Sequence, residues 1–136
     1  MALALLLLGA AAAAPAAEVS DADAKAIRGV ISEQLEAFAR DDAARAFALA
    51  TGGIRERFGS AEAFMEMVRT GYPVVYRPTT VQFEAPAVVA GEVIQPVRMT
   101  DAEGQAWIAF YPMQREAGGR WRIDGCRLER LRDRRA

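Results

Sequence analysis

Apolar residues recur at helical spacing through the first half of the chain, and capping residues divide them into segments. Ser20 is a good N-cap and predicts a first helix over residues 21–40 with a single apolar stripe. A pair of aspartates then predicts the cap of a second helix over 43–50. Ser60 predicts the cap of a third helix over 61–70, which ends before a glycine and a proline.

The apolar period changes to two after residue 73, which indicates strands. The predicted extended segments are a short piece at 74–76 and longer strands at 81–89, 93–99, 105–115 and 120–128. Asp124 and Gly125 shift the parity of the last strand, which suggests a bulge. Pro96 and Pro112 fall inside strands, so each must lie at an edge or a bulge.

This order of elements predicts an α+β domain in which three N-terminal helices pack on a curved antiparallel β-meander. One further turn of helix is left open at 54–58. The strand 106–113 is apolar on both faces, whereas a sheet with one wet face alternates. We therefore expect the second face to be covered, either by a second copy in a homodimer through the sheet face or by chain from the same protomer.

An uncharged apolar run precedes the helical region, over residues 2–14. It has the length of a secretory signal core and is too short to span a bilayer. We expect residues 1–16 to be a signal peptide cleaved near Ala16 and residues 17–136 to form one domain, periplasmic or secreted. A buried N-terminal helix is the alternative. No cysteine lies near this site to carry a lipid, so we expect no stable membrane anchor.

Composition excludes several kinds of chemistry. The chain has no His and one Cys, which rules out His-based triads, an intrachain disulfide and Cys-rich metal sites. We expect no metal and no cofactor. The net charge of −1 gives no overall bias toward nucleic acid, and we expect no nucleic-acid partner. Cys126 lies at an inward strand position and is interpreted as a buried thiol, with an interchain disulfide or a redox role as alternatives.

Several segments resemble a known family. They are Glu33–Phe38, Asp41–Phe47, Arg57–Gly59, Phe64–Val68, Gly71–Pro78, Trp107–Gln114 and Trp121–Cys126. Together they are similar to the bacterial exported proteins of domain-of-unknown-function family 4864, within the nuclear-transport-factor-two-like (SnoaL-like) superfamily. The resemblance implies a cone-shaped fold. It implies no activity, because that superfamily contains isomerases, dehydratases, epoxide hydrolases, ligand binders and interaction domains.

The segment 71–78, with two Pro, two Tyr and an Arg, is the most unusual local sequence. One interpretation places Tyr72, Tyr76 and Arg77 at the mouth of a cone, where they would hold a polar or anionic group. The other is a structural corner in which Arg77 bridges to an acid. The candidate pocket residues are Phe64, Met67, Tyr72, Tyr76, Arg77, Trp107, Tyr111 and Met113. Simple core packing is the competing interpretation for the apolar members.

Two functions remain open from the sequence. The first is a non-catalytic domain that binds a small apolar ligand or a protein partner. The second is a His-independent isomerase or hydrolase that uses a buried carboxylate and a Tyr. A buried acid within hydrogen-bond reach of a Tyr hydroxyl in an open pocket would favour the enzyme. The sequence contains few inward acids, and Asp124 is interpreted as turn chemistry, so we expect no catalytic residue.

Overall fold

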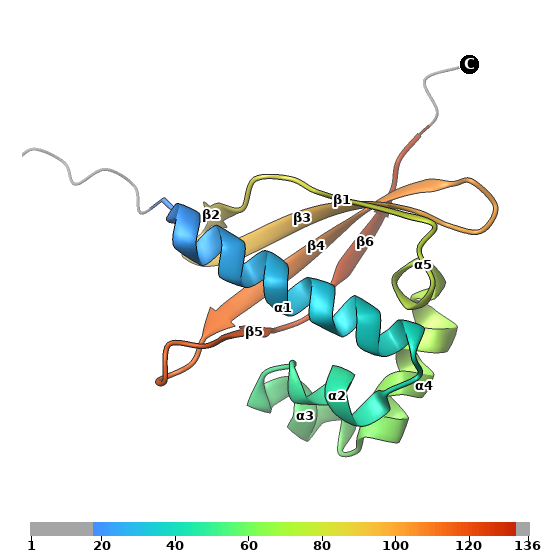
Figure 1. The fold of residues 1–136 in the computed structure, drawn as a ribbon, viewed down its shortest axis with the longest axis horizontal. Helices are drawn as coiled ribbons and strands as arrows, with labels where there is room; N and C mark the ends of the chain where they lie inside the picture. Colours follow the sequence, from blue (N-terminus) through green and yellow to red (C-terminus); the bar gives the residue numbers. More distant parts are fainter. Residues whose placement is uncertain (1–17, 133–136) are drawn as a thin grey trace, which may run out of the picture.

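The computed structural model describes residues 18–132. Helices come first and a curled antiparallel sheet follows, as Figure 1 shows. The helices are α1 (Asp21–Ala39), α2 (Ala43–Ala48), α3 (Gly52–Phe58), α4 (Ala61–Gly71) and α5 (Pro73–Tyr76). The strands are β1 (Thr80–Phe83), β2 (Ala87–Val89), β3 (Glu92–Thr100), β4 (Ala106–Arg115), β5 (Trp121–Ile123) and β6 (Arg127–Arg130). The α+β class and the order of helices before strands are thus confirmed. The predicted signal peptide lies outside the described residues.

The helix boundaries follow the capping residues in the sequence. The Ser20 hydroxyl accepts a hydrogen bond from the Asp23 amide at 3.1 Å, and Ser60 caps α4 in the same way. The described residues form five helices, where three were expected. Thr51 is the N-cap of α3, because its hydroxyl accepts a hydrogen bond from the Ile54 amide.

The short piece at 74–76 is helical, and the prediction of an extended segment there was wrong. Pro73 occupies the first turn of α5, where its missing N–H leaves no donor unpaired. Val74 and Val75 are adjacent in sequence and both are buried. An extended chain would place neighbouring side chains on opposite faces, so packing against the core favours a turn of helix.

The sheet is a meander with β3 and β4 at its centre. β1 and β2 both pair with β3, while β5 and β6 both pair with β4, and every pairing is antiparallel. The expected strands 81–89 and 120–128 are therefore each divided in two.

The divisions fall beside the two strand prolines. Pro96 cannot donate to its neighbour, and its carbonyl accepts from the Glu84 amide at 3.1 Å in the gap between β1 and β2. Pro112 accepts in the same manner from the Asp124 amide at 2.8 Å, in the gap between β5 and β6. Gly125 follows with φ of 145°, a conformation that side chains disfavour. Neither proline lies on an edge strand, and each lies opposite a break in the neighbouring strand, where the hydrogen-bond ladder is interrupted.

The core lies between α1 and the inner face of the sheet, and Figure 1 shows the helix crossing that face. Ile27, Ile31 and Phe38 supply the helical side, each with no more than 1% of its surface exposed. The sheet side includes Val97, Met99, Ala109, Tyr111 and Met113, which share one parity as predicted. Burying a large aliphatic or aromatic side chain contributes roughly 1.5–3 kcal/mol.

Candidate functional site

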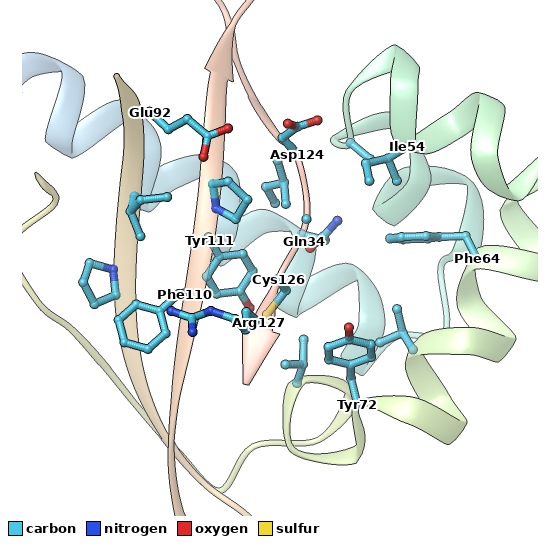
Figure 2. Close-up of a pocket in the computed structure, with 18 of the residues that line it drawn as sticks. Gln34, Ile54, Phe64, Tyr72, Glu92, Phe110, Tyr111, Asp124, Cys126 and Arg127 are labelled. Carbon is cyan, nitrogen blue, oxygen red and sulfur yellow. The ribbon is translucent and has the colours of Figure 1, made fainter. Parts of the chain in front are cut away.

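An open cleft of about 840 Å³ lies between the helices and the β4–β6 side of the sheet. We call it the main cleft, and Figure 2 shows its labelled residues arranged around β4. Its helical wall includes Phe38, Ile54, Phe58, Phe64, Met67, Val68, Tyr72 and Val75. Its sheet wall includes Ile94, Pro96, Phe110, Tyr111, Pro112 and Ile123. A concave, mostly apolar cleft of this size is typical of small-molecule sites.

A cluster of aromatic rings fixes the helical wall. The ring of Phe64 lies 6.1 Å from that of Phe38, 5.6 Å from that of Phe47 and 5.7 Å from that of Phe58, measured between centroids. These tilted and edge-on arrangements are the favourable ones for aromatic pairs. They bring together side chains from α1, α2, α3 and α4 in one aromatic cluster.

Tyr111 is the distinctive residue of the sheet wall. It lies on β4 with 1% of its surface exposed, and its hydroxyl has no hydrogen-bond partner among the described residues. Burial raises the pKa of the Tyr111 phenol well above its ordinary value, and the neighbouring Cys126 adds to this effect. The hydroxyl is therefore neutral at physiological pH, and the group beside it is the Cys126 thiol, which is only a weak hydrogen-bond partner.

Cys126 lies next to this hydroxyl, and Figure 2 shows the Tyr111 side chain pointing toward it. Burial raises the pKa of the Cys126 thiol to about 12, and Tyr111 opposes that shift only in part. A thiol with such a pKa carries almost no thiolate at pH 7, so it is a poor nucleophile. The gap between β5 and β6 brings Cys126 here, because the chain leaves β4 at Asp124 and rejoins it at Arg127.

Charged residues also border the main cleft. Asp124 is half-buried and its carboxylate accepts from the Thr51 hydroxyl at 2.7 Å and from the Gln114 amide at 2.9 Å. Arg127 pairs with Glu129 at 2.9 Å and lies over the Phe110 ring, 4.8 Å from its centroid. These contacts hold the segment 124–127 in place at the border of the cleft.

The structure distributes the predicted pocket residues over three places. Phe64, Met67, Tyr72 and Tyr111 line the main cleft. Tyr76, Arg77 and Trp107 line a second groove of about 770 Å³ between α5, the β3–β4 hairpin and β6. Tyr72 borders both. Met113 lines neither and is part of the buried core, with 4% of its surface exposed.

Tyr76 and Arg77 form a corner around Asp41. The Tyr76 hydroxyl and the Arg77 guanidinium both donate to the Asp41 carboxylate, and the guanidinium lies 4.1 Å from the centre of the Tyr76 ring. Arg77 also donates to the Phe38 carbonyl. Arg77 thus bridges to an acid, as the structural interpretation of the segment describes. The Tyr76 hydrogen bond lowers the pKa of Asp41, and Arg77 and Arg69 lower it further against partial desolvation.

The main polar contact in the second groove is the hydrogen bond between Trp107 and Asp101, and it has a structural role. The Trp107 indole donates to the Asp101 carboxylate at 2.9 Å, and this bond lowers the pKa of Asp101, with the Gln105 and Glu103 amides contributing. Asp101 thereby organises the β3–β4 hairpin, where Gly104 turns the chain with φ of 82°. The Trp107 indole and the Asp101 carboxylate of the second groove therefore already have hydrogen-bond partners within the protein.

The sequence-based set did not include most residues of the main cleft, among them Gln34, Ile54, Asp124 and Cys126. Gln34 was detectable, because it lies seven residues after Ile27 and three after Ile31, on the apolar stripe of α1. A polar residue on such a stripe needs a partner, and its amide donates to the Ala46 carbonyl at 3.1 Å. Ile54 and Asp124 carried no such signal, since the bridge between Ala50 and Ile123 and the hydrogen bond from Thr51 to Asp124 bring these two segments together.

A family model described as Domain of unknown function (DUF4864) matches residues 20–136. The chain belongs to this family. No curated protein and no solved structure matches it. The part of the DUF4864 domain that the structure describes contains no helix long and apolar enough to cross a membrane. Within residues 18–132 there is also no cluster of three Cys, Asp or Glu side chains suited to a metal ion.

The main cleft of the DUF4864 domain has a Tyr hydroxyl and a carboxylate on its lining, but within residues 18–132 no hydrogen bond joins them. Tyr111 has no carboxylate within hydrogen-bond reach among the described residues. Asp124 borders the same cleft, but Thr51 and Gln114 occupy its oxygens. The one bond between a Tyr hydroxyl and a carboxylate that the described residues make is that of Tyr76 to Asp41, at an exposed corner. The main cleft offers mostly apolar surface and a neutral hydroxyl, and its lining also carries the charged side chains of Arg57, Glu92, Asp124 and Arg127.

Proposed function

We propose that this chain is a non-catalytic binding protein that holds a small, mostly apolar ligand in the main cleft. One observation carries the proposal: the buried Tyr111 hydroxyl lacks a partner in the wall of a large apolar cleft. Buried polar groups without partners are rare in proteins, and each destabilises the fold. A bound ligand that supplies the partner is the simplest reason for such a group to border a cleft.

The experiment is a titration with N-phenyl-1-naphthylamine, a neutral probe whose fluorescence rises in apolar surroundings. We expect the wild-type protein to bind it and Ile54→Trp, which fills the cleft, to weaken binding at least tenfold. Val81→Trp is the matched control, because Val81 is 40% exposed on β1 and lies outside the cleft lining. Equal binding by Ile54→Trp and the wild type, or no binding by either, would overturn the proposal.

Native mass spectrometry of the protein from its own host gives a second readout. The expected result is a mass excess that disappears on denaturation and is absent in Ile54→Trp. A protein that retains nothing, and that also fails to bind the probe, counts against a ligand-binding role.

We also infer that the fold is the cone of the nuclear-transport-factor-two-like (SnoaL-like) superfamily and that the protein is bacterial. The curled sheet behind N-terminal helices supports this inference. A crystal structure would test it: strands that flatten away from the helices would contradict a cone.

Export is part of the same proposal. The apolar run at 2–14 supports it, and the family match begins after that run, at residue 20. N-terminal sequencing of protein recovered from the periplasm should give a start near Ala17. Leu6→Arg should keep the precursor in the cytoplasm, because a charge disrupts the apolar signal core. An uncleaved protein in the cytoplasm would contradict export.

A homodimer through the outer sheet face is the partner we propose. Phe110, Pro96 and Ile94 share that face, are only half-buried within the protomer and also line the main cleft, so a second copy would close that side of the cleft. A second copy would complete their burial.

A further inference from the structure

The main cleft has a neutral polar point in an apolar wall. The Tyr111 hydroxyl and the Cys126 thiol lie together, and both are uncharged at physiological pH because burial opposes their ionisation. The charged side chains of the lining are Arg57, Glu92, Asp124 and Arg127, and two of them have partners within the protein. Asp124 accepts two hydrogen bonds, and Arg127 pairs with Glu129.

This arrangement discriminates between ligand head groups. A carboxylate placed beside Tyr111 would lose its hydration, the lining cation Arg127 is already paired with Glu129, and the carboxylate of Asp124 borders the same cleft. A neutral oxygen loses less hydration and can be satisfied by a single hydroxyl. The rest of such a ligand would lie against the phenylalanines of the helical wall.

We propose that Tyr111 hydrogen-bonds to the neutral oxygen, a hydroxyl or a carbonyl, of an otherwise apolar ligand in the main cleft. This rests on the proposed function and names the ligand class. The hydroxyl itself has almost no exposed surface. Cys126 lies against it and borders the cleft, so the proposed hydrogen bond requires the thiol to move aside. Cys126 is a neutral cover of the hydroxyl and not a nucleophile.

Two substitutions isolate the hydrogen bond while leaving the cleft almost unchanged in volume. Tyr111→Phe removes the hydroxyl. Cys126→Ser places a hydroxyl beside Tyr111 and gives it a partner inside the protein, which competes with the ligand. Cys126→Ala is the matched control for the second variant, because it removes the thiol without adding a donor.

The ligands are 1-dodecanol, 2-dodecanone, dodecane and dodecanoate, which share a chain length. Each is measured at pH 7.5 by displacement of N-phenyl-1-naphthylamine. For every ligand the affinity of a variant is divided by that of the wild type, which cancels differences in solubility. We expect Tyr111→Phe and Cys126→Ser to weaken dodecanol and dodecanone about three- to tenfold, the size of one neutral hydrogen bond. Dodecane should be unaffected, and dodecanoate should bind the wild type more weakly than dodecanol.

The outcomes separate this inference from the proposed function. If no ligand displaces the probe, or the probe itself does not bind, the binding role fails. If all four bind and Tyr111→Phe changes none of them, the cleft binds ligands but the role of Tyr111 is overturned. If dodecanoate binds the wild type more tightly than dodecanol, the neutral ligand class is overturned. A similar loss in Cys126→Ala and Cys126→Ser would overturn the competition by an internal partner.

Discussion

Gln95 and Tyr111 lie opposite each other on the central strands β3 and β4, and each buries an oxygen that has no hydrogen-bond partner among the described residues. The amide of Gln95 donates to the Glu84 carbonyl at 2.7 Å and to the Pro96 carbonyl at 2.8 Å, so this side chain fills the gap beside Pro96. The Tyr111 hydroxyl makes no comparable hydrogen bond among the described residues, and Tyr111 borders the main cleft. We therefore interpret Gln95 as a structural polar residue and Tyr111 as a candidate binding residue.

Removing the Tyr111 hydroxyl should stabilise the ligand-free protein. A buried oxygen without a partner destabilises the folded state by roughly 1–3 kcal/mol, and Phe keeps the ring that packs in the core. We expect Tyr111→Phe to raise the free energy of unfolding by about 1 kcal/mol in urea denaturation. Tyr72→Phe, at a half-buried position of the same cleft, should change it by no more than about 0.5 kcal/mol. A less stable Tyr111→Phe would mean that the hydroxyl is paired in solution.

The Thr51 side chain joins the helices to the sheet. Its hydroxyl caps α3 and donates to Asp124, while the Thr51 amide donates to the Ile123 carbonyl at 2.9 Å. Thr51→Ala should lower the free energy of unfolding by about 2 kcal/mol, because it removes a cap and a hydrogen bond to a carboxylate. Thr51→Ser keeps both bonds and should lose about 1 kcal/mol or less. Equal losses in the two variants would assign the effect to packing of the methyl group.

The corner around Asp41 should make stability depend on acid. The Tyr76 hydrogen bond, followed by the charges of Arg77 and Arg69, holds the pKa of Asp41 below its ordinary value of 3.8. A carboxyl with a lowered folded-state pKa stabilises the fold fully above its ordinary pKa and loses that effect as pH falls through the folded-state value. The urea midpoint of Asp41→Asn should therefore fall below that of the wild type at pH 6 and approach it at pH 2.5.

Asn is the suitable replacement because Asp41 has φ of 55°, a conformation that Asn tolerates. A difference between the two proteins that stays constant from pH 6 to pH 2.5 would show that the Asp41 charge does not stabilise the corner.

The proposed dimer makes a prediction for the outer sheet face. Phe110→Glu places a charge on that face and should give a monomer, whereas the wild type should have twice the protomer mass in light scattering coupled to size exclusion. Within the protomer the new carboxylate lies beside Arg127, which favours folding of the variant. Val88→Glu is the control, because Val88 is exposed and its partner Val93 has the parity of the inner face. A monomeric wild type would contradict the dimer.

The longer elements were predictable because their patterns have a local cause. Ser20 and Ser60 cap helices by bonds to amides three residues away, and the alternation along β3 and β4 follows from the pleat of a strand. The short elements were not predictable in this way. Val74 and Val75 favour a strand by their branched side chains, but the core buries both and a turn of helix results.

The candidate site was predictable only in part. Phe64, Met67, Tyr72 and Tyr111 were identified from aromatic and apolar positions on predicted inner faces, and they do line one cleft. Trp107 has the same strand parity as Tyr111 but lies nearer the hairpin and borders the second groove. Parity determines the face on which a side chain lies, and the position along a strand determines which neighbours it meets.

The sequence by itself determined the family, the α+β order, the strand parity and the absence of His chemistry, since each depends on residue types and on spacings within a few residues. The tertiary structure alone decided that Tyr111 would lack a partner, that Cys126 would cover it, and that Asp124 would be held by Thr51. Those relations join residues far apart in the chain, and hydrogen bonding at a buried atom depends on every element packed around it.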